Sequence, residues 1–309
     1  MNVAGESEFK YLINYNNINI NGYDTLKFYD FNINGGSLSN GLIYASDADF
    51  ITISSSQFNN IQSDNNLIEF SNFESVIVEN SKFGYDAENT ITNNLFNLSS
   101  GETLELSENH FINNTSTNGS IFFAVDINSI AIESNNKIEN NESAKGGLYF
   151  KNSNELNIVG TTFNNNISTG NGGALLIENV ASTLIENSSF NINQALNGGA
   201  LSVLNNAGGN VGGNVGVLTI TNSTFTGNAS NENGGAIYAY GLSKVTINTN
   251  NGLTTFTNNG EVDETKTQNG GAIYIDKVSI VELSDLTFTN NTCSTNGGAV
   301  AVVNSVSNG

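Results

Sequence analysis

The chain has 309 residues, of which 38% are hydrophobic and only 12% are charged, and its formal net charge at pH 7 is −20. Its nine basic residues are all lysines. Because an acidic surface repels phosphate backbones and anionic lipid headgroups, we expect no nucleic-acid partner and no membrane-surface partner. No apolar stretch approaches the roughly 20 residues that a membrane span requires. The 18 phenylalanines and 10 tyrosines fall at regular intervals, which argues against a disordered chain.

The first 25 residues are polar and repeat the later pattern only weakly. No basic segment followed by an apolar one stands at the start, so we expect no signal peptide there. A degenerate coil around Ile18, Ile20 and Tyr23 predicts an N-terminal cap or first coil over residues 1–25.

A strand pattern centred on one phenylalanine then recurs along the chain. Its clearest copy is Leu218–Asn228, where apolar residues alternate at Leu218 and Ile220, and Asn228 follows Phe225 by three positions. In chain order, the other copies centre on Phe31, Phe58, Phe83, Phe111, Ile138, Phe163, Phe190, Phe256 and Phe288. Where nothing is inserted, the spacing of about 25 to 28 residues is that of one solenoid repeat.

A second motif, Asn-Gly-Gly-Ala-aliphatic, follows the phenylalanine by about nine residues. Its glycine pairs are Gly172 and Gly173, Gly198 and Gly199, Gly234 and Gly235, Gly270 and Gly271, and Gly297 and Gly298. Weaker copies stand at Gly35-Gly36 and Gly146-Gly147. Because the two motifs alternate in fixed order through most of the chain, they indicate an internal repeat and not a bias of composition.

Two insertions interrupt this register, at residues 206–216 and 260–268, and we expect both to be loops on the outside of the fold. The apolar residues from Val300 to Val306 carry no polar cap. We therefore expect the chain to end partway through a coil of a longer protein.

Each repeat contains two short runs of alternating apolar residues, separated by clusters of Gly, Asn and Ser that are typical of turns. The spacers are too short for the helix of a βαβ crossover, so equivalent strands must stack directly on one another. The sequence thus predicts an all-β fold: a right-handed, single-stranded parallel β-helix (solenoid) of about ten coils, continuous over residues 1–309.

Stacking explains which residues recur. We expect the phenylalanines to point inward and form an aromatic ladder with a spacing of about 4.8 Å. The asparagine three positions later is expected to form an amide ladder of its own, and the glycine pair to serve a turn with positive φ or a crowded backbone. The predicted repeat residues are Phe111, Asn114, Phe163, Asn166, Phe190, Asn193, Phe225, Asn228, Phe256, Asn259, Phe288 and Asn291, with the five complete glycine pairs.

These alternating Phe-x-x-Asn and Gly-Gly-Ala-Ile/Leu/Val motifs resemble the repeats of the chlamydial polymorphic outer-membrane protein family, over roughly residues 31 to 300. Similar repeats occur in large surface proteins of AT-rich protists. The resemblance implies a surface-exposed autotransporter passenger with a role in adhesion. The sequence departs from the family pattern after Phe111, where Asn118-Gly119-Ser120 replaces the glycine motif.

The chemistry of the side chains favours a protein without catalytic activity. Enzymes with this fold that cleave polysaccharides resemble one another in carrying an Arg or Lys base with acidic Ca²⁺ ligands, or Asn-Thr-Asp, Asp-Asp and Gly-His-Gly motifs. Arginine and these motifs are missing. Next to Phe111, the single His110 is expected to face outward as a solvated surface residue. We interpret Cys293 and the acidic groups at 47–49, 102–108 and 263–264 as surface residues, and expect no metal site and no cofactor.

Three functional classes remain open. The first is a non-enzymatic extracellular surface protein that binds a protein or glycan ligand, as an adhesin does. The second is a structural subunit that associates end to end in a filament or coat. The third is a polysaccharide lyase or hydrolase. We expect no regular Thr-x-Thr rows, which are typical of ice-binding solenoids.

Overall fold

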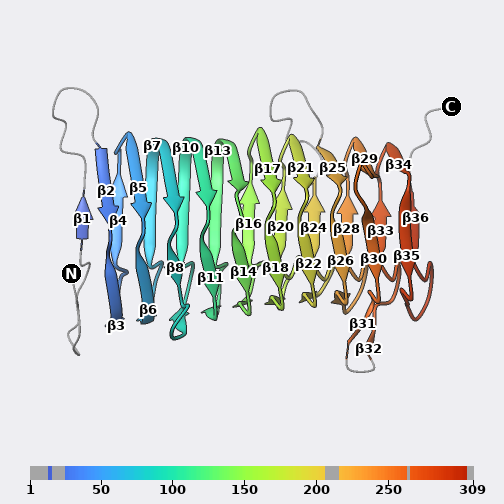
Figure 1. Cartoon of the computed structure of the whole chain (residues 1–309), viewed down its shortest axis with the longest axis horizontal. Helices are drawn as coiled ribbons and strands as arrows, with labels where there is room; N and C mark the ends of the chain where they lie inside the picture. The colour runs from blue at the N-terminus through green and yellow to red at the C-terminus, as the bar shows by residue number, and fades with distance from the viewer. Residues whose placement is uncertain (1–12, 16–24, 206–215, 263–264, 305–309) are drawn as a thin grey trace.

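The computed structural model describes residues 13–15, 25–205, 216–262 and 265–304. Within these ranges the regular structure consists of β-strands, which form a parallel β-solenoid of about ten turns. Figure 1 shows the coils side by side along one axis, with the N-terminal strands at one end and the C-terminal strands at the other. The predicted fold class is confirmed.

Each regular coil contains four strands, and equivalent strands of successive coils form four rows. The first row contains β1 (Ile13–Tyr15), β4 (Ile43–Ser46), β16 (Leu148–Lys151), β20 (Leu175–Glu178), β24 (Leu201–Leu204), β28 (Ile237–Tyr240), β33 (Ile273–Asp276) and β36 (Val300–Val303). The second row contains β2 (Thr25–Tyr29), β5 (Phe50–Ser54), β17 (Glu155–Val159), β21 (Ser182–Glu186), β25 (Val217–Thr221), β29 (Lys244–Asn248) and β34 (Ile280–Leu283). Three long strands run through both rows: β7 (Ile68–Glu79), β10 (Phe96–Ser107) and β13 (Phe122–Glu133).

The third row holds the repeated phenylalanines. It contains β3 (Asn32–Leu38), β6 (Gln57–Ser63), β8 (Lys82–Phe83), β11 (His110–Ile112), β14 (Lys137–Glu139), β18 (Thr162–Asn164), β22 (Ser189–Asn191), β26 (Thr224–Thr226), β30 (Thr254–Thr257) and β35 (Leu286–Thr289). The fourth row contains β9 (Asn89–Ile91), β12 (Asn114–Ser116), β15 (Glu142–Ser143), β19 (Ile167–Ser168), β23 (Gln194–Ala195) and β27 (Ala229–Ser230).

Neighbouring strands within a row are parallel and in register, as the sequence alternation requires. Leu218 and Ile220 of β25 lie opposite Thr183 and Ile185 of β21, and the four side chains are buried. Because side chains alternate between the two faces of a strand, the residues between them point outward. The apolar positions of all the rows therefore meet in one interior core that extends along the solenoid axis.

The sharp corners after the third row place one residue in the left-handed region of φ. This residue is Asn in most coils, Gly227 in one, and Ile192 in another, where φ is 54°. Asn and Gly adopt this conformation with little strain because a short polar side chain, or none, avoids the clash that a β-branched side chain meets. The corner explains why an asparagine so often precedes the repeated asparagine of the Phe-x-x-Asn motif.

The expected insertion at residues 260–268 contains an antiparallel hairpin of β31 (Glu261–Val262) and β32 (Thr265–Lys266). It projects from the lower edge of the solenoid in Figure 1 and leaves the parallel rows intact. Most of the other expected insertion, residues 206–215, lies outside the described residues. So do residues 1–12 and 16–24 of the expected cap and residues 305–309 of the expected unfinished coil.

Two expectations for the first coils are wrong. Ile33, not Phe31, takes the ladder position, since Ile33 pairs with Phe58. Phe31 instead packs edge-on against Phe28, with ring centroids 5.6 Å apart. Gly35 and Gly36 are not a corner before the first row, because both lie within β3.

Candidate functional site

The repeated phenylalanines stack inside the coils. In the C-terminal half, Phe163, Phe190, Phe225, Phe256 and Phe288 form one continuous stack with centroid separations of 4.6–5.0 Å and interplanar angles of 2–13°. Phe58, Phe83 and Phe111 form a second stack, which Ile138 separates from the first. Strand spacing sets the distance between rings, so one large residue per coil fills the interior without gaps.

The repeated asparagines form a buried amide chain beside this stack. We name it the inner ladder, and it comprises Asn89, Asn114, Asn141, Asn166, Asn193, Asn228, Asn259 and Asn291. Each Nδ2 donates to the Oδ1 of the next coil at 2.9–3.0 Å. The same Nδ2 also donates to a main-chain carbonyl of an earlier coil, as Asn193 does to Phe163 at 3.1 Å. These amides satisfy one another, which buried polar groups require.

The two glycines of each pair are needed for different reasons. The first has a positive φ, 61° at Gly198, and a Cβ there would lie 2.2 Å from the carbonyl oxygen of Leu201 and 3.1 Å from the Cβ of Tyr238. The second has no positive φ, but a Cβ at Gly199 would lie 2.2 Å from the carbonyl oxygen of Gly235 and 2.3 Å from that of Ala229. The glycine corner therefore passes close to the backbone of the next coil and to an outward side chain of the first row.

A second asparagine ladder, which the sequence analysis did not identify, follows the glycine corners. This corner ladder comprises Asn171, Asn197, Asn233, Asn269 and Asn296, the residues that directly precede the glycine pairs. Here each Nδ2 donates to the Oδ1 of the preceding coil at 3.0–3.2 Å. The signal was present in the sequence as the invariable first residue of the Asn-Gly-Gly motif in these five coils.

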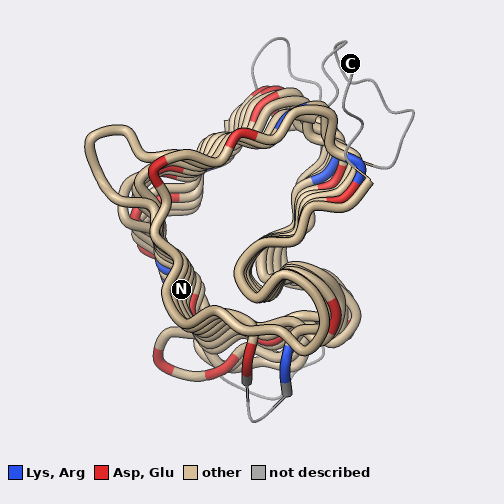
Figure 2. The backbone as a smooth tube through the Cα atoms, turned by 90° about the vertical axis from the view of Figure 1, so that its right-hand side faces the viewer, with Lys and Arg blue, Asp and Glu red and all other residues tan. Residues whose placement is uncertain are grey.

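Apolar side chains also gather outside the solenoid, on the outward face of the first row. This external strip comprises Phe123, Tyr149, Leu176, Leu204, Tyr238 and Tyr240, which form a cluster separate from the interior core. Tyr149 and Leu176 are only 8% and 5% exposed although their strands face outward at these positions. Viewed along the axis, the coil is indented on one side (Figure 2). The strip is thus covered in part by the protein itself.

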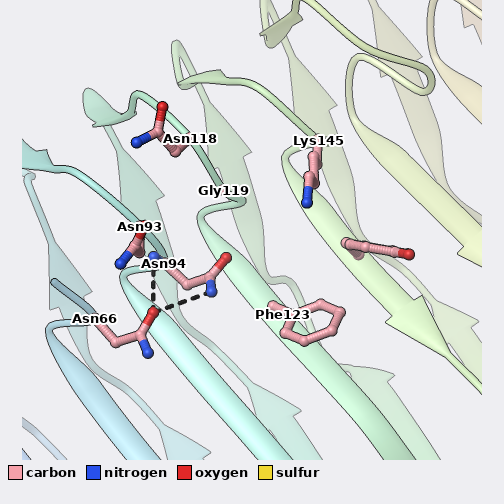
Figure 3. A pocket seen from close by; sticks show the side chains of 8 residues that line it. Asn66, Asn93, Asn94, Asn118, Gly119, Phe123 and Lys145 are labelled. Carbon is pink, nitrogen blue, oxygen red and sulfur yellow. Dashed lines mark hydrogen bonds between the residues drawn. The ribbon is translucent and has the colours of Figure 1, made fainter.

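A hollow of about 260 Å³ lies over the first coils of this strip. Its lining combines the rings of Phe123 and Tyr149, which are 4.9 Å apart, with Gly119, Lys145 and the amide side chains of Asn66, Asn93, Asn94 and Asn118. Figure 3 shows the side chains arriving from successive coils, with the asparagine amides on the left and Phe123 and Lys145 to their right. The Nδ2 of Asn94 donates to the Oδ1 of Asn66 at 3.1 Å, which fixes one edge of the hollow.

We call the hollow the groove, and the external strip continues beyond it. Tyr149 donates its hydroxyl to the Oε2 of Glu178 at 2.6 Å, and Lys151 lies 3.7 Å from the same oxygen. Burial, followed by this hydrogen bond, raises the pKa of Tyr149. Farther along the row, the ring centroids of Tyr238 and Tyr274 are 5.7 Å apart, and burial raises the pKa of Tyr238 to about 12. Tyr149 and Tyr238 are therefore neutral hydrogen-bonding groups at neutral pH.

Comparison with known proteins finds a similar repeat in four segments of the chain. Residues 160–178, 222–240, 253–276 and 285–302 each match the Chlamydia polymorphic membrane protein repeat. These four segments are similar to polymorphic membrane protein repeats. The resemblance predicted from the sequence is confirmed, with matched segments that together cover less than half of the chain. No curated protein and no solved structure matches the chain.

Each matched polymorphic membrane protein repeat occupies the same part of a coil. It begins beside the third row, passes through the glycine corner and ends in the first row, as residues 222–240 do from β26 to β28. One repeat therefore supplies a ring of the Phe stack, one member of each asparagine ladder and the first outward residue of a first-row strand. In the four matched repeats these first outward residues are Leu176, Tyr238, Tyr274 and Ala301.

The histidine lies away from the groove. His110 faces outward from β11, as expected, but it is only partly exposed, and its Nδ1 is buried without a hydrogen-bond partner. Lys82 and Lys137 flank it in the neighbouring coils. Burial, with the two lysines adding to it, lowers the pKa of His110. The expected outward orientation is therefore observed, and the ring is partly buried at the surface.

The remaining candidate residues are scattered. Among the described residues, no three His, Cys, Asp or Glu side chains lie together as a metal site would require, and Asp263 and Glu264 lie outside the described range. Cys293 is a free, partly exposed thiol. No helix in the described part of the chain could cross a membrane.

The expectation that Thr-x-Thr rows are missing is wrong for three coils. Thr224, Thr255 and Thr287 lie opposite one another on the third row, and so do Thr226, Thr257 and Thr289. In the two preceding coils the second column continues as Asn164 and Asn191, so the threonine array ends there.

Proposed function

We propose that this chain is a non-enzymatic, adhesin-like segment of an extracellular surface protein, and that it binds its ligand in the groove. The hollow at Phe123 and Tyr149 is the observation that carries the proposal. Tyr149, Leu176 and Leu204 of the external strip are buried by the protein itself, and the hollow is the described part of the strip that is open to a ligand. Concave surfaces that combine aromatic rings with a few polar groups are typical of binding sites.

The polymorphic membrane protein repeats support the surface location. The matched segments include Leu176, Tyr238 and Tyr240 of the external strip, whereas the hollow lies before the first matched segment. The acidic surface, with a formal net charge of −20, favours solubility and disfavours anionic partners.

Binding can be tested with the fluorescently labelled chain on intact eukaryotic cells, measured by flow cytometry. We expect saturable binding that is lost when Phe123→Ser and Tyr149→Ser are combined. The matched control is Thr226→Ala with Thr257→Ala, which alters the outward face of the third row and should bind as the unaltered chain does. Circular dichroism must show that both variants fold. Equal binding by all three proteins, or no binding by any of them, contradicts the proposal.

The absence of catalysis has a separate test. Incubation with pectin, alginate and neutral polysaccharides should release no oligosaccharide products, because no pair of acidic and basic groups recurs in the groove. Product release that disappears when a single Asp or Glu is replaced would show instead that the chain is a polysaccharide-cleaving enzyme.

End-to-end association is the second candidate function, and one observation favours it. In the last described coil, Val302 and Val303 of β36 are 44% and 37% exposed, and they pair with β33 on one side. A further coil, whether from the same protein or from another copy, could stack there. Light scattering at increasing concentration distinguishes a monomer from a growing filament, and a monomer at all concentrations contradicts this alternative.

A further inference from the structure

The groove lies where the chain departs from the Asn-Gly-Gly motif. The corners beside it read Asn93-Asn94 and Asn118-Gly119, whereas a glycine pair occupies each corner from Gly146 onward. A Cβ at Gly146 would lie 2.9 Å from the Cβ of Leu176, so the first of these glycine corners covers the outward side chain of the following coil. The earlier corners leave the outward face beside them open.

The groove is closed at its C-terminal end. Tyr149 is 8% exposed, and Leu176 in the next coil is 5% exposed. Phe123, which is partly exposed, is therefore the aromatic ring that a ligand can contact. The volume of about 260 Å³ lies below the roughly 300 Å³ at which pockets for drug-sized ligands begin. The groove thus suits one compact unit at the end of a longer molecule.

Two polar side chains of the groove are unengaged. Within the part of the chain that the structure describes, Lys145 forms no ion pair, whereas Lys151, Lys244 and Lys266 each lie beside a glutamate. The side-chain amide of Asn118 has no hydrogen-bond partner among the same residues. In Figure 3 the nitrogen of Lys145 points toward the side of the groove where Phe123 lies. An ammonium group with an amide nearby offers several donors to an anionic acceptor.

The local charges favour a single negative group on the ligand. Lys145 is the one formal charge among the residues that line the groove. The two glutamates that bond to lining residues are already engaged, Glu69 with Asn66 at 3.0 Å and Glu178 with Tyr149 at 2.6 Å. The formal charge of −20 disfavours a polyanion. At physiological salt, however, such repulsion is screened beyond about 8 Å, so the unpaired ammonium dominates inside the groove.

We infer that the groove binds the terminal sugar of a glycan, and that this sugar carries one carboxylate group. The carboxylate pairs with Lys145, the amide of Asn118 bonds hydroxyl groups, and the C–H face of the sugar ring rests on Phe123. A sugar acid combines these three features in one unit of the size that the groove admits. The inference rests on the proposed function and names the chemical class of its ligand.

The test uses the full chain and matched sugars: the methyl glycosides of sialic acid and of glucuronic acid, each with its uncharged methyl ester. Binding is screened by saturation-transfer NMR and measured by calorimetry. We expect at least one acid to bind, and its ester to bind at least about tenfold more weakly because one charge-assisted contact is lost. Added salt should weaken binding of the acid.

Substitutions separate the charge from the apolar contact. Lys145→Gln should weaken the acid by about tenfold, and Lys145→Arg, which keeps the charge, should retain most of the affinity. Phe123→Ser should weaken acid and ester alike, because it removes the ring that both contact. The matched control is Lys27→Gln, since Lys27 is an exposed lysine on β2 outside the groove, and it should change nothing. Circular dichroism must show that each variant folds.

Three results overturn the inference: neither acid binds, an ester binds as tightly as its acid, or Lys145→Gln binds the acid as the unaltered chain does. The cell-binding experiment separates this inference from the proposed function. Cell binding that requires Phe123 and Tyr149 but is unchanged by Lys145→Gln would retain the proposed function and overturn the present inference. Binding of the acid through Lys145 without any binding to cells would contradict the proposed function alone. If both hold, enzymatic removal of the terminal acidic sugar from cells should abolish binding.

Discussion

The side-chain amide of Asn193 donates to the side-chain oxygen of Asn228 at 3.0 Å, across a sequence separation of 35 residues. The preceding step of the inner ladder, from Asn166 to Asn193, spans 27 residues and has a length of 2.9 Å. The ladder geometry is therefore the same whether or not residues are inserted between two rungs. Such insertion is tolerated because a longer connection between two rungs costs little additional closure entropy.

Asn193→Asp should destabilise the fold by about 3–5 kcal/mol at neutral pH, because a buried carboxylate would face acceptors. The Nδ2 of Asn193 donates to the carbonyl oxygen of Phe163 and to the Oδ1 of Asn228, and a carboxylate can donate to neither. Burial should raise the pKa of the new carboxyl above its unfolded value. The variant should thus regain stability as the pH falls through that raised pKa. Urea unfolding at several pH values measures both effects.

Asn191→Asp is the matched control, because Asn191 lies two positions earlier and faces outward. It should change the free energy of unfolding by less than about 0.5 kcal/mol, as surface substitutions usually do. Equal effects of the two substitutions would mean that the inner ladder does not stabilise the coils.

Phe225→Ala should cost about 3–5 kcal/mol, the usual loss for a buried aromatic residue. Phe225 is fully buried and stacks on Phe190 and Phe256 at 4.7 and 4.9 Å. Guanidinium unfolding followed by circular dichroism gives the change. Leu253→Ala serves as the comparison, since Leu253 is 68% exposed and its truncation should have little effect. An unchanged midpoint for Phe225→Ala would rule out a structural role for the stack.

Ile192→Asn should stabilise the protein by about 1 kcal/mol. Ile192 has a φ of 54°, which strains a β-branched residue, and its side chain is 51% exposed, so little burial is lost. Equivalent corners carry Asn165 and Asn258 at similar φ. Differential scanning calorimetry should show a higher melting temperature. Ile192→Val retains the branching and should show no gain, so a gain in both variants would assign the effect to something other than φ.

Gly199→Ala tests the steric requirement for glycine, and Gly227→Ala tests the conformational requirement of a positive φ. At Gly227 φ is 64° and a Cβ would meet nothing closer than 3.5 Å, so the substitution should cost only the conformational strain, about 1 kcal/mol. At Gly199 a Cβ would lie 2.2 Å from the carbonyl oxygen of Gly235. The coil must then shift, and the cost should exceed about 3 kcal/mol, beyond the usual range for added atoms. Equal thermal shifts would show that the corner has room.

The pH dependence of stability should include a contribution from His110. Its folded pKa is lowered from 6.5, so the unfolded chain binds the additional proton more readily. Stability should therefore rise with pH between the lowered folded pKa and 6.5, and fall as the solution is acidified through that window. NMR titration gives the pKa directly. Lys137→Gln should raise the His110 pKa, because it removes a nearby positive charge, and an unchanged value would contradict this account.

The regular part of the fold was predictable because each coil repeats two constraints at fixed spacing. In most coils one large residue packs in the phenylalanine row and one amide occupies the corner after it. Residues equivalent to Phe163 and Asn166 are therefore found at regular spacing along the sequence. The first coils lack this redundancy. There Phe28, Phe31 and Ile33 are all apolar, so the sequence does not show which of them lies in the phenylalanine row. The sequence pattern predicted Phe31, whereas pairing with Phe58 places Ile33 in that row.

The external strip could have been recognised from consecutive apolar residues. Leu148-Tyr149-Phe150 and Leu175-Leu176-Ile177 do not alternate with polar residues, and such runs indicate strands that are covered on both faces. The sequence could not show what covers the outer face. That depends on how closely the glycine corners approach Leu176 and Tyr238, a distance set by backbone geometry. The groove therefore required the structure.

The two asparagine ladders give the solenoid opposite polarities along the same axis. In the inner ladder the N–H groups point toward the C-terminal coils, as from Asn259 to Asn291, whereas in the corner ladder they point toward the N-terminal coils, as from Asn269 to Asn233. Aligned amides sum to a dipole, so the two chains of dipoles oppose each other. The upper and lower faces of a coil consequently present different donors and acceptors at the same corners. Head-to-tail stacking of coils continues both ladders, because each donor then meets an acceptor at the same corner.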